Sequence, residues 1–366
     1  MPVETGVSYF SSRTLRHVSD DFQEIIAQGC SYVVHCYTET DLDYYRDTMR
    51  DVITATHGAG LDAWLDPWGV AGIFSGETFS RFPLDHPEAW QVLSDARRAG
   101  AACPNHPETR AFLRGWIDAC AAAGGSVLFW DEPHFYIGLW RGDLSGAWAC
   151  RCEACQALFR ERYGGEMPLE FTAEVRAFRE SSLLELLTQL CRYGHEKGLR
   201  NALCLLPADP SEHGFPQQEE RLAAALERRL AEAPAGALEA MLHFGVGDYD
   251  AAAAIPDLDI FGCDPYWYLF GTEPEPFERA YGGAAAEAAR RHGRDLQLWV
   301  QAFSVPEGRE EELRTGLRVA EELGASHVAA WSVEATATMS RIRCARPDVV
   351  WRIIGEEFRR LRGGPA

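Results

Sequence analysis

Short apolar runs alternate along the chain with stretches of helical periodicity, and this alternation limits the fold more than any other feature. Eight runs have the length of buried strands, and Gly, Pro or polar residues follow each before a helical pattern begins. This order is typical of βαβ units, which build parallel sheets. The runs are Val7–Phe10, Tyr32–Tyr37, Leu61–Leu65, Ser126–Trp130, Ala202–Leu206, Leu258–Cys263, Leu296–Phe303 and Val328–Val333.

Eight such units predict an α/β protein in which residues 1–366 form one (β/α)8 TIM barrel. A further apolar run, Leu238–Phe244, has the length of a ninth strand. The eight-strand count requires it to belong to an insertion after the fifth strand, which we place at residues 207–250. Helical patterns cover, for example, Pro107–Ala122, Ala173–Lys197, Gln217–Glu232, Pro276–His292, Arg309–Leu323 and Pro347–Leu361.

The charge of the chain excludes several classes of partner. A net charge of −20 repels phosphate backbones and anionic membranes, and no basic run is interleaved with aromatic residues. We therefore expect no nucleic-acid and no membrane partner. The N-terminal residues lack the pattern of a secretory signal, and no apolar run reaches about 18 residues. These features predict a cytoplasmic protein, and they leave a homo-oligomer open.

Carboxylates and aromatic residues follow most of the predicted strands. In a parallel barrel the residues after the strands form the catalytic face, because the βα loops open there. Sugars present C–H faces that stack on aromatic rings, and carboxylates cleave glycosidic bonds. The pattern therefore predicts a carbohydrate site. Its candidate substrate-binding residues are Asp66, Trp68, His134, Tyr266, Trp267, Trp299, Gln301 and Trp331, and Asp209 follows the fifth strand.

The segment Trp130-Asp131-Glu132-Pro133 is the strongest candidate for the chemistry. Glu132 follows a buried strand and lies beside Asp131, so burial and a neighbouring like charge are both expected to raise its pKa. A carboxyl with a raised pKa suits a general acid that protonates a leaving oxygen. We predict Glu132 as the general acid/base and Asp131 as its partner. Asp264 and Glu334 are the further catalytic candidates.

Eleven cysteines are an odd number, and most of them lie within apolar patterns typical of buried thiols. Four are different. Cys150, Cys152 and Cys155 fall within six residues, and Cys103 lies upstream, so together they describe a closed structural zinc site that staples two βα loops. Three cysteines with His106, an open catalytic zinc, or no metal are the alternatives. The cysteines assigned to the core are Cys30, Cys36, Cys120, Cys191, Cys204, Cys263 and Cys344.

The segments Ala102-Cys103-Pro104-Asn105-His106-Pro107, Trp130-Asp131-Glu132-Pro133 and Cys150-Arg151-Cys152-Glu153-Ala154-Cys155 resemble family-42 glycoside hydrolases, the β-galactosidases of the large retaining-glycosidase barrel clan. The resemblance implies that the four cysteines hold zinc and that Glu132 is the acid/base. Two positions depart from the clan. Asp131 stands where Asn is usual, and Gln301 stands where the nucleophilic Glu is expected at the end of the seventh strand.

Glutamine cannot form the usual glycosyl-enzyme ester, so the mechanism has several possible forms. Asp131 and Glu132 are similar to the Asp-Glu pair of hexosaminidases that use the 2-acetamido group of the substrate as nucleophile. Alternatively, Glu334 or Asp264 supplies the second carboxylate. The leading prediction is an exo-acting O-glycosidase that trims small oligosaccharides or glycosides. A carbohydrate-binding barrel without catalysis is the rival from another class.

Overall fold

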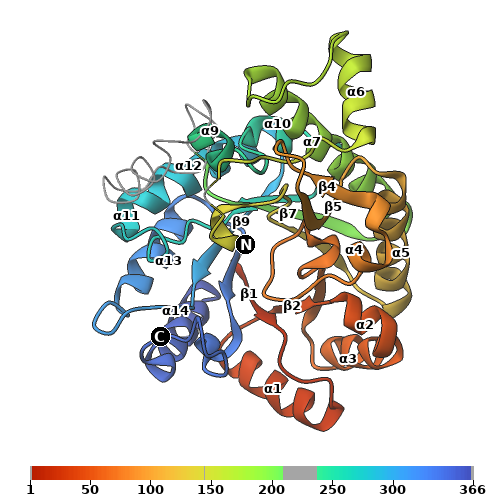
Figure 1. The fold of residues 1–366 in the computed structure, drawn as a ribbon. Helices are drawn as coiled ribbons and strands as arrows, with labels where there is room; N and C mark the ends of the chain where they lie inside the picture. The colour runs from red at the N-terminus through yellow and green to blue at the C-terminus, as the bar shows by residue number, and fades with distance from the viewer. Residues whose placement is uncertain (1, 144, 209–236, 364–366) are drawn as a thin grey trace.

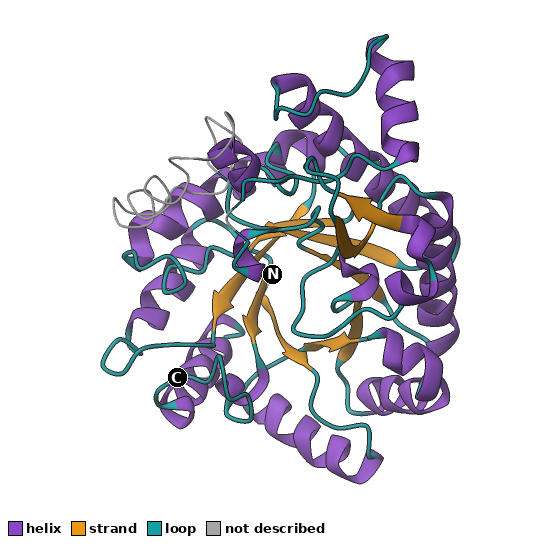
Figure 2. Ribbon diagram, viewed as in Figure 1, coloured by secondary structure: helices purple, strands orange, loops and turns teal. Residues whose placement is uncertain are grey.

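A computed structural model of the chain describes residues 2–143, 145–208 and 237–363. Its centre is a closed barrel of parallel strands ringed by helices (Figure 2). The order around the barrel is β1-β2-β3-β6-β7-β8-β9-β10, and β10 returns to pair with β1. These strands are β1 (Glu4–Tyr9), β2 (Tyr32–Cys36), β3 (Asp62–Asp66), β6 (Val127–Asp131), β7 (Arg200–Leu205), β8 (Ile260–Cys263), β9 (Asp295–Gln301) and β10 (His327–Trp331).

The barrel confirms the predicted TIM-barrel fold, since each of the eight predicted strands overlaps one barrel strand. The helices lie on the outside and bury their apolar faces against the strands (Figure 1). No helix in the described ranges combines the length and the apolar character needed to cross a bilayer. The main helices are α1 (Leu15–Ala27), α2 (Glu39–Tyr44), α3 (Arg46–Gly58), α4 (Phe82–Asp85), α5 (Pro107–Ala123), α6 (Glu153–Tyr163), α7 (Ala173–Glu196), α10 (Tyr249–Ala253), α11 (Pro274–Phe277), η4 (Glu278–Gly282), α12 (Gly283–His292), α13 (Glu312–Glu322) and α14 (Pro347–Leu361).

Alternate residues of each strand fill the interior of the barrel, because side chains point to opposite faces of a strand with a period of two. Tyr32 and Trp64 stack with ring centroids 4.3 Å apart near the N-terminal ends of β2 and β3. Above them, Phe129 packs on Trp299 at 5.1 Å. The interior is therefore a packed core rather than a pore, and a cavity lies at its C-terminal end.

The loop after β3 carries a hairpin that the sequence analysis did not predict. Strands β4 (Trp90–Val92) and β5 (Arg98–Ala102) pair antiparallel. The segment after β6 joins this hairpin, since Leu93 and Ala149 form an antiparallel bridge and the Arg151 N–H donates to the Val92 carbonyl at 2.7 Å. The loops after β3 and β6 are thus tied together by backbone hydrogen bonds.

The run Leu238–Phe244 does not form a ninth strand. Residues Ala237–Leu242 make a short helix, α9, between β7 and β8. The run combines Ala, Leu, Glu and Met, which favour helix, and it has no β-branched residue to favour a strand. Residues 209–236, which include Asp209 and most of the expected insertion at 207–250, lie outside the described residues.

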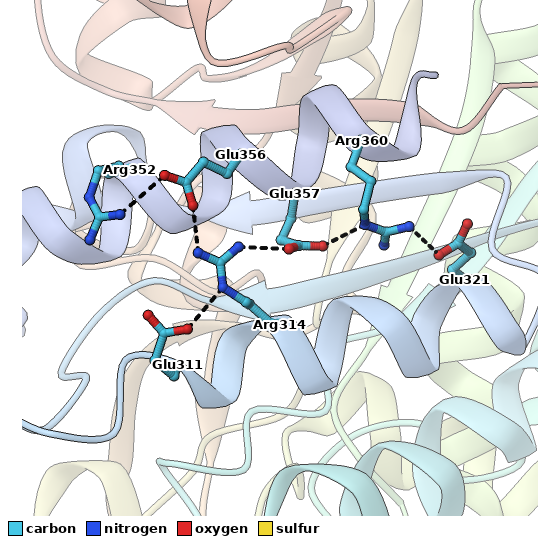
Figure 3. A network of polar contacts seen from close by, with 7 residues as sticks. All are labelled: Glu311, Arg314, Glu321, Arg352, Glu356, Glu357 and Arg360. Atoms are coloured by element: carbon cyan, nitrogen blue, oxygen red, sulfur yellow. Dashed lines mark hydrogen bonds and ion pairs between the residues drawn. The ribbon is translucent and has the colours of Figure 1, made fainter. Parts of the chain in front are cut away.

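A network of Arg and Glu side chains joins α13 to α14, the last helix around the barrel (Figure 3). Arg314 of α13 contacts Glu357 of α14 at 2.7 Å, and that carboxylate also accepts from Arg360 at 2.8 Å. Partly exposed pairs of this kind add little stability singly, but the shared partners orient α14. The network consists of Glu311, Arg314, Glu321, Arg352, Glu356, Glu357 and Arg360.

Candidate active site

Each barrel strand places one interior side chain at the C-terminal mouth. Trp64, Phe129 and Trp299 point into the interior of the barrel. Because side chains alternate along a strand with a period of two, the residues two positions further along also point inward and form the last layer. The layer holds Ser8, Cys36, Asp66, Asp131, Cys204, Asp264, Gln301 and Trp331. A cavity at the mouth is lined by Ser8, Cys36, Asp66, Trp68, Phe129, Asp131, Cys204, Tyr266, Trp299 and Trp331.

Glu132 lies beside this layer and breaks the alternation. Its backbone has a φ of 41°, in the left-handed region that non-glycine residues rarely adopt. Its N–H donates to the Cys204 carbonyl at 3.0 Å, which holds the turn against β7. The Ser75 hydroxyl donates to its carboxylate. The Glu132 carboxyl also shares a hydrogen bond with Asp264, so residues after β3, β6 and β8 meet at this group.

Three buried carboxyls surround Glu132, and each has a raised pKa. Burial is the main cause of the raised pKa values of Asp66, Asp131 and Asp264. Neighbouring carboxylates raise them further, since Glu132 acts on all three and Asp66 also acts on Asp131. A thiol hydrogen bond from Cys36 at 3.6 Å partly opposes the rise at Asp66. The mouth is therefore rich in buried carboxyl groups whose ionised forms are disfavoured.

Aromatic rings form a continuous wall beside the carboxyls. Trp68 stacks on Phe10 at 5.4 Å, and Phe10 meets the edge of Trp331 at 5.1 Å. Phe303 continues the chain of contacts from Trp331, at 6.5 Å, to Tyr266, at 5.2 Å. Acidic and aromatic surfaces facing one cavity suit a ligand that has both hydroxyl groups and C–H faces.

Several polar atoms at the mouth have no partner among the described residues. They are Ser8 Oγ, Asp66 Oδ1, Asp264 Oδ1 and the indole nitrogen of Trp299, and all are buried. Buried polar groups in native proteins are nearly always hydrogen-bonded, so each unpaired one requires an explanation. Two of these atoms belong to donors and two are carboxylate acceptors. A ligand with hydroxyl groups would satisfy both kinds.

The structure brings most of the predicted sugar-binding residues to the cavity at the mouth. Asp66, Trp68, Tyr266, Trp299 and Trp331 line it. The predicted site residues that do not line it are Glu132, His134, Asp264, Trp267, Gln301 and Glu334. Trp267 instead packs in the outer core, in the space beside Gly316 of α13. Glu334 is exposed on η5 (Val333–Thr336), and the charges that act on it are Glu24 and Asp21 of α1.

His134 and Gln301 have their polar groups engaged by the backbone. The His134 Nδ1 contacts the Glu132 carbonyl at 2.7 Å, and burial lowers the pKa of the ring to about 4, so the neutral imidazole supports the Glu132 turn. The Gln301 amide accepts from the Leu269 N–H and donates to the Phe303 carbonyl, both at 2.9 Å. Its side chain thus ties the loop after β8 to the end of β9.

Several residues of the site were absent from the predicted list. They include Cys36, Phe129 and Cys204, which line the cavity. Ser8 and Phe10 follow from the alternation along β1, which predicts that both point into the interior. Neither residue is charged, so the search for carboxylates after strands did not select them. Ser75 and Glu77 come from the loop after β3 and reach the mouth only through tertiary contacts. The Glu77 carboxylate lies at the rim, beside the Trp68 indole, and its charge acts on Asp66 and Asp131.

The predicted cysteine cluster is present in the tied loops. The sulfurs of Cys103, Cys150, Cys152 and Cys155 lie within 4.8 Å of one another, and all four residues are buried. Tetrahedral zinc with Zn–S bonds of about 2.3 Å needs sulfurs roughly 3.8 Å apart, so the arrangement fits a metal ion. Cys152 caps α6 and Cys155 lies in its first turn, where the helix dipole favours thiolate.

Neighbouring residues suit a negatively charged metal centre. The Asn105 amide donates to the Cys155 sulfur at 3.4 Å. Burial lowers the pKa of Arg179 to about 9, and the sulfurs of Cys150 and Cys155 oppose that effect. Four thiolates around a divalent ion leave a net negative charge, which a buried guanidinium offsets. His106 is not part of this cluster. Its Nδ1 accepts from the Glu108 N–H at the start of α5.

Comparisons with known proteins find similarity at the level of the fold. No family model and no curated protein matches the chain. An endo-1,4-beta-mannanase from Rhizomucor miehei aligns over 98% of this chain and 95% of its own, with 10% identity and a TM-score of 0.59. An endo-beta-1,4-mannanase from Thermotoga petrophila aligns over 99% of this chain and 77% of its own, with 12% identity and a TM-score of 0.56.

A D-psicose 3-epimerase from Clostridium cellulolyticum H10 aligns over 98% of both chains, with 11% identity and a TM-score of 0.47. At such identities the likeness concerns the fold alone. The barrel is therefore similar in structure to TIM-barrel mannanases, whereas the narrower resemblance to family-42 glycoside hydrolases has no support from these comparisons.

Proposed function

We propose that this protein is a glycoside hydrolase whose site is the mouth of the barrel. One observation carries the proposal: buried carboxyls from several strands meet at Glu132 beside a wall of aromatic rings. Glycoside hydrolysis needs a carboxylic acid near a second carboxylate, and aromatic rings bind the apolar faces of sugars. The fold shared with mannanases is consistent with this chemistry.

In the proposed reaction Glu132 is the general acid. It gives its proton to the glycosidic oxygen as the bond to the anomeric carbon breaks, so the leaving group departs as an alcohol. Asp131, which lines the cavity, stabilises the positive charge that develops on the sugar ring. Water then adds to the anomeric carbon and returns a proton to the Glu132 carboxylate.

Asp264 is better suited to positioning than to nucleophilic attack. Its carboxyl is in hydrogen-bond contact with that of Glu132, whereas the catalytic pair of retaining enzymes is separated by about 5–5.5 Å. Burial and the Glu132 charge raise the pKa of Asp264, so Asp264 is suited to donating a hydrogen bond to the Glu132 carboxylate. Asp264, Trp331 and Tyr266 would then shape the sugar subsite.

A substrate-assisted reaction is the second candidate, and the position of Gln301 favours it. Both polar groups of this amide are held by backbone partners, so β9 offers no nucleophile. Asp131 lines the cavity directly before Glu132, where it would orient a 2-acetamido group for attack on the anomeric carbon. In this version Glu132 keeps the same role as the acid.

Glu132→Gln tests both versions. Loss of the transferable proton should lower kcat/KM for unactivated glycosides by at least about a hundredfold. The fold should remain intact, because the amide still accepts from Ser75. Glu196→Gln, an exposed substitution at the end of α7, is the control and should leave turnover unchanged. Full activity of Glu132→Gln would remove Glu132 from the mechanism.

A zinc ion bound by Cys103, Cys150, Cys152 and Cys155 is proposed as a structural element of this enzyme. Four sulfur ligands complete a tetrahedron and leave no position for water or substrate, so the ion would have no part in the chemistry. Its role would be to fix the loops after β3 and β6, which carry Ser75 and Glu132.

A further inference from the structure

The mouth of the barrel holds more carboxyl groups than hydrolysis of a neutral glycoside requires. Two carboxyl groups suffice for that reaction. Here Asp66, Asp131, Glu132 and Asp264 lie together, and Glu77 adds its charge at the rim. The charged side chains that act most strongly on Asp66, Asp131 and Asp264 are other carboxylates. Ionisation of the whole group is therefore costly without a cation.

Unpartnered buried atoms at the same cavity point independently to a ligand. Asp66 is 4% exposed, and its Oδ1 has no hydrogen-bond partner among the described residues. The Trp299 indole N–H and the Ser8 hydroxyl, 3% and 4% exposed, are likewise without partners in those ranges. All three residues line the cavity. A carboxylate acceptor and two donors together fit a molecule with N–H or O–H donors and oxygen acceptors.

We infer that the sugar held at this mouth carries a positive charge and is an amino sugar with a free amine. The inference rests on the proposed function and narrows it. An ammonium group beside Asp66 and Asp131 relieves their mutual repulsion and donates hydrogen bonds to their oxygens. Hydroxyl groups of the ring pair with the Trp299 and Ser8 donors, and the ring itself lies against Trp331. A neutral hydroxyl in place of the ammonium offers no charge that would stabilise the ionised form of these carboxyls.

Matched substrates test the inference on the intact protein. The substrates are 4-nitrophenyl glycosides of glucosamine, galactosamine and mannosamine, each compared below neutral pH with its 2-hydroxy and N-acetyl counterparts. We expect kcat/KM to be about tenfold higher or more for at least one free amine than for its two counterparts. Asp66→Asn should reduce this preference about tenfold. Asp20→Asn, which removes an exposed charge on α1, should leave it unchanged.

Binding of the free sugars separates the two proposals. Equal or faster turnover of the neutral or N-acetyl glycosides would overturn the inference and leave the hydrolase standing. Thermal stabilisation by glucosamine, galactosamine or mannosamine, absent with the neutral sugars and without turnover of any glycoside, would keep the charged ligand and remove the hydrolase. If the amino sugars neither stabilise the protein nor are released by it, the inference is wrong. A preference unchanged in Asp66→Asn would also contradict it.

Discussion

Glu132 combines an unfavourable backbone conformation with a central position at the mouth of the barrel. A left-handed φ of 41° costs a non-glycine residue about 1–2 kcal/mol. Strain of this kind persists where the surroundings fix the residue, and it is frequent at functional sites. Here the Cys204 carbonyl, the Ser75 hydroxyl and His134 fix it. The strained turn is what brings the carboxyl beside Asp264.

Glu278 is a second residue whose environment opposes its charge. It is fully buried on η4, and neither carboxyl oxygen has a hydrogen-bond partner among the described residues. Burial raises its pKa well above the ordinary value of about 4.3. The folded state therefore holds a proton that the unfolded state releases, so this group lowers the stability progressively as the pH rises above about 4.3.

Replacing Glu278 should stabilise the protein. Glu278→Met keeps the length of the side chain and removes the carboxyl, so we expect Tm to rise by a few degrees at pH 8 and the gain to fade towards pH 4. Thermal unfolding followed across this pH range measures the difference. Glu196→Met on the exposed end of α7 should show no such pH dependence. A Glu278→Met variant less stable than the wild type at pH 8 would indicate a required partner for this carboxyl.

At the scale of elements, one side chain couples the loop after β8 to strand β9. Gln301 accepts from Leu269 in that loop and donates to Phe303 beyond β9. Phe303 in turn contacts both Tyr266 and Trp331. The amide therefore holds two sides of the aromatic wall in register, which a carboxylate at the same position could not do, because it has no donor.

Gln301→Glu should consequently destabilise the protein without improving catalysis. A carboxylate oxygen would face the Phe303 carbonyl and leave it unpaired, at a cost of roughly 1–3 kcal/mol in the free energy of unfolding. We expect a lower Tm and no increase in kcat on aryl glycosides. Gln23→Glu, exposed on α1, is the control for the added charge. A large gain in turnover would show that this position takes a nucleophile after all.

The whole molecule depends on contacts between loops that are far apart in the sequence. The hairpin β4–β5 and the segment around Ala149 bring Cys103 to the other three cysteines. A metal ion there would lock the loops after β3 and β6, on which Ser75 and Glu132 meet. We therefore expect metal loss to lower stability and activity together.

Cys103→Ser should reduce bound zinc from about one ion per chain to almost none, as measured by elemental analysis, and lower Tm by several degrees. Activity should fall at temperatures at which the loops have loosened. Cys344→Ser is the matched control, since Cys344 is a buried thiol outside the cluster. Zinc retained in Cys103→Ser, or no metal in the wild type, would contradict this assignment.

The sequence by itself determined the architecture. Hydrophobic periodicity depends on local geometry, so eight apolar runs were enough to predict the barrel strands, and the positions after them identified Asp66, Asp131, Glu132 and Asp264. The cysteine spacing likewise predicted the cluster of four sulfurs. Each of these features repeats within a few residues or follows from the rule that strand ends share one face of a barrel.

Only the tertiary structure decided how these residues meet. The sequence treats Trp267 and Tyr266 alike, yet successive side chains after a strand point to different sides, so one packs on α13 and the other lines the cavity. Glu334 follows a strand as Asp131 does, but its turn directs it towards α1. Ser75 and Glu77 join the site from a loop with no period to predict its path. Contacts between distant segments depend on packing in three dimensions, which local patterns do not specify.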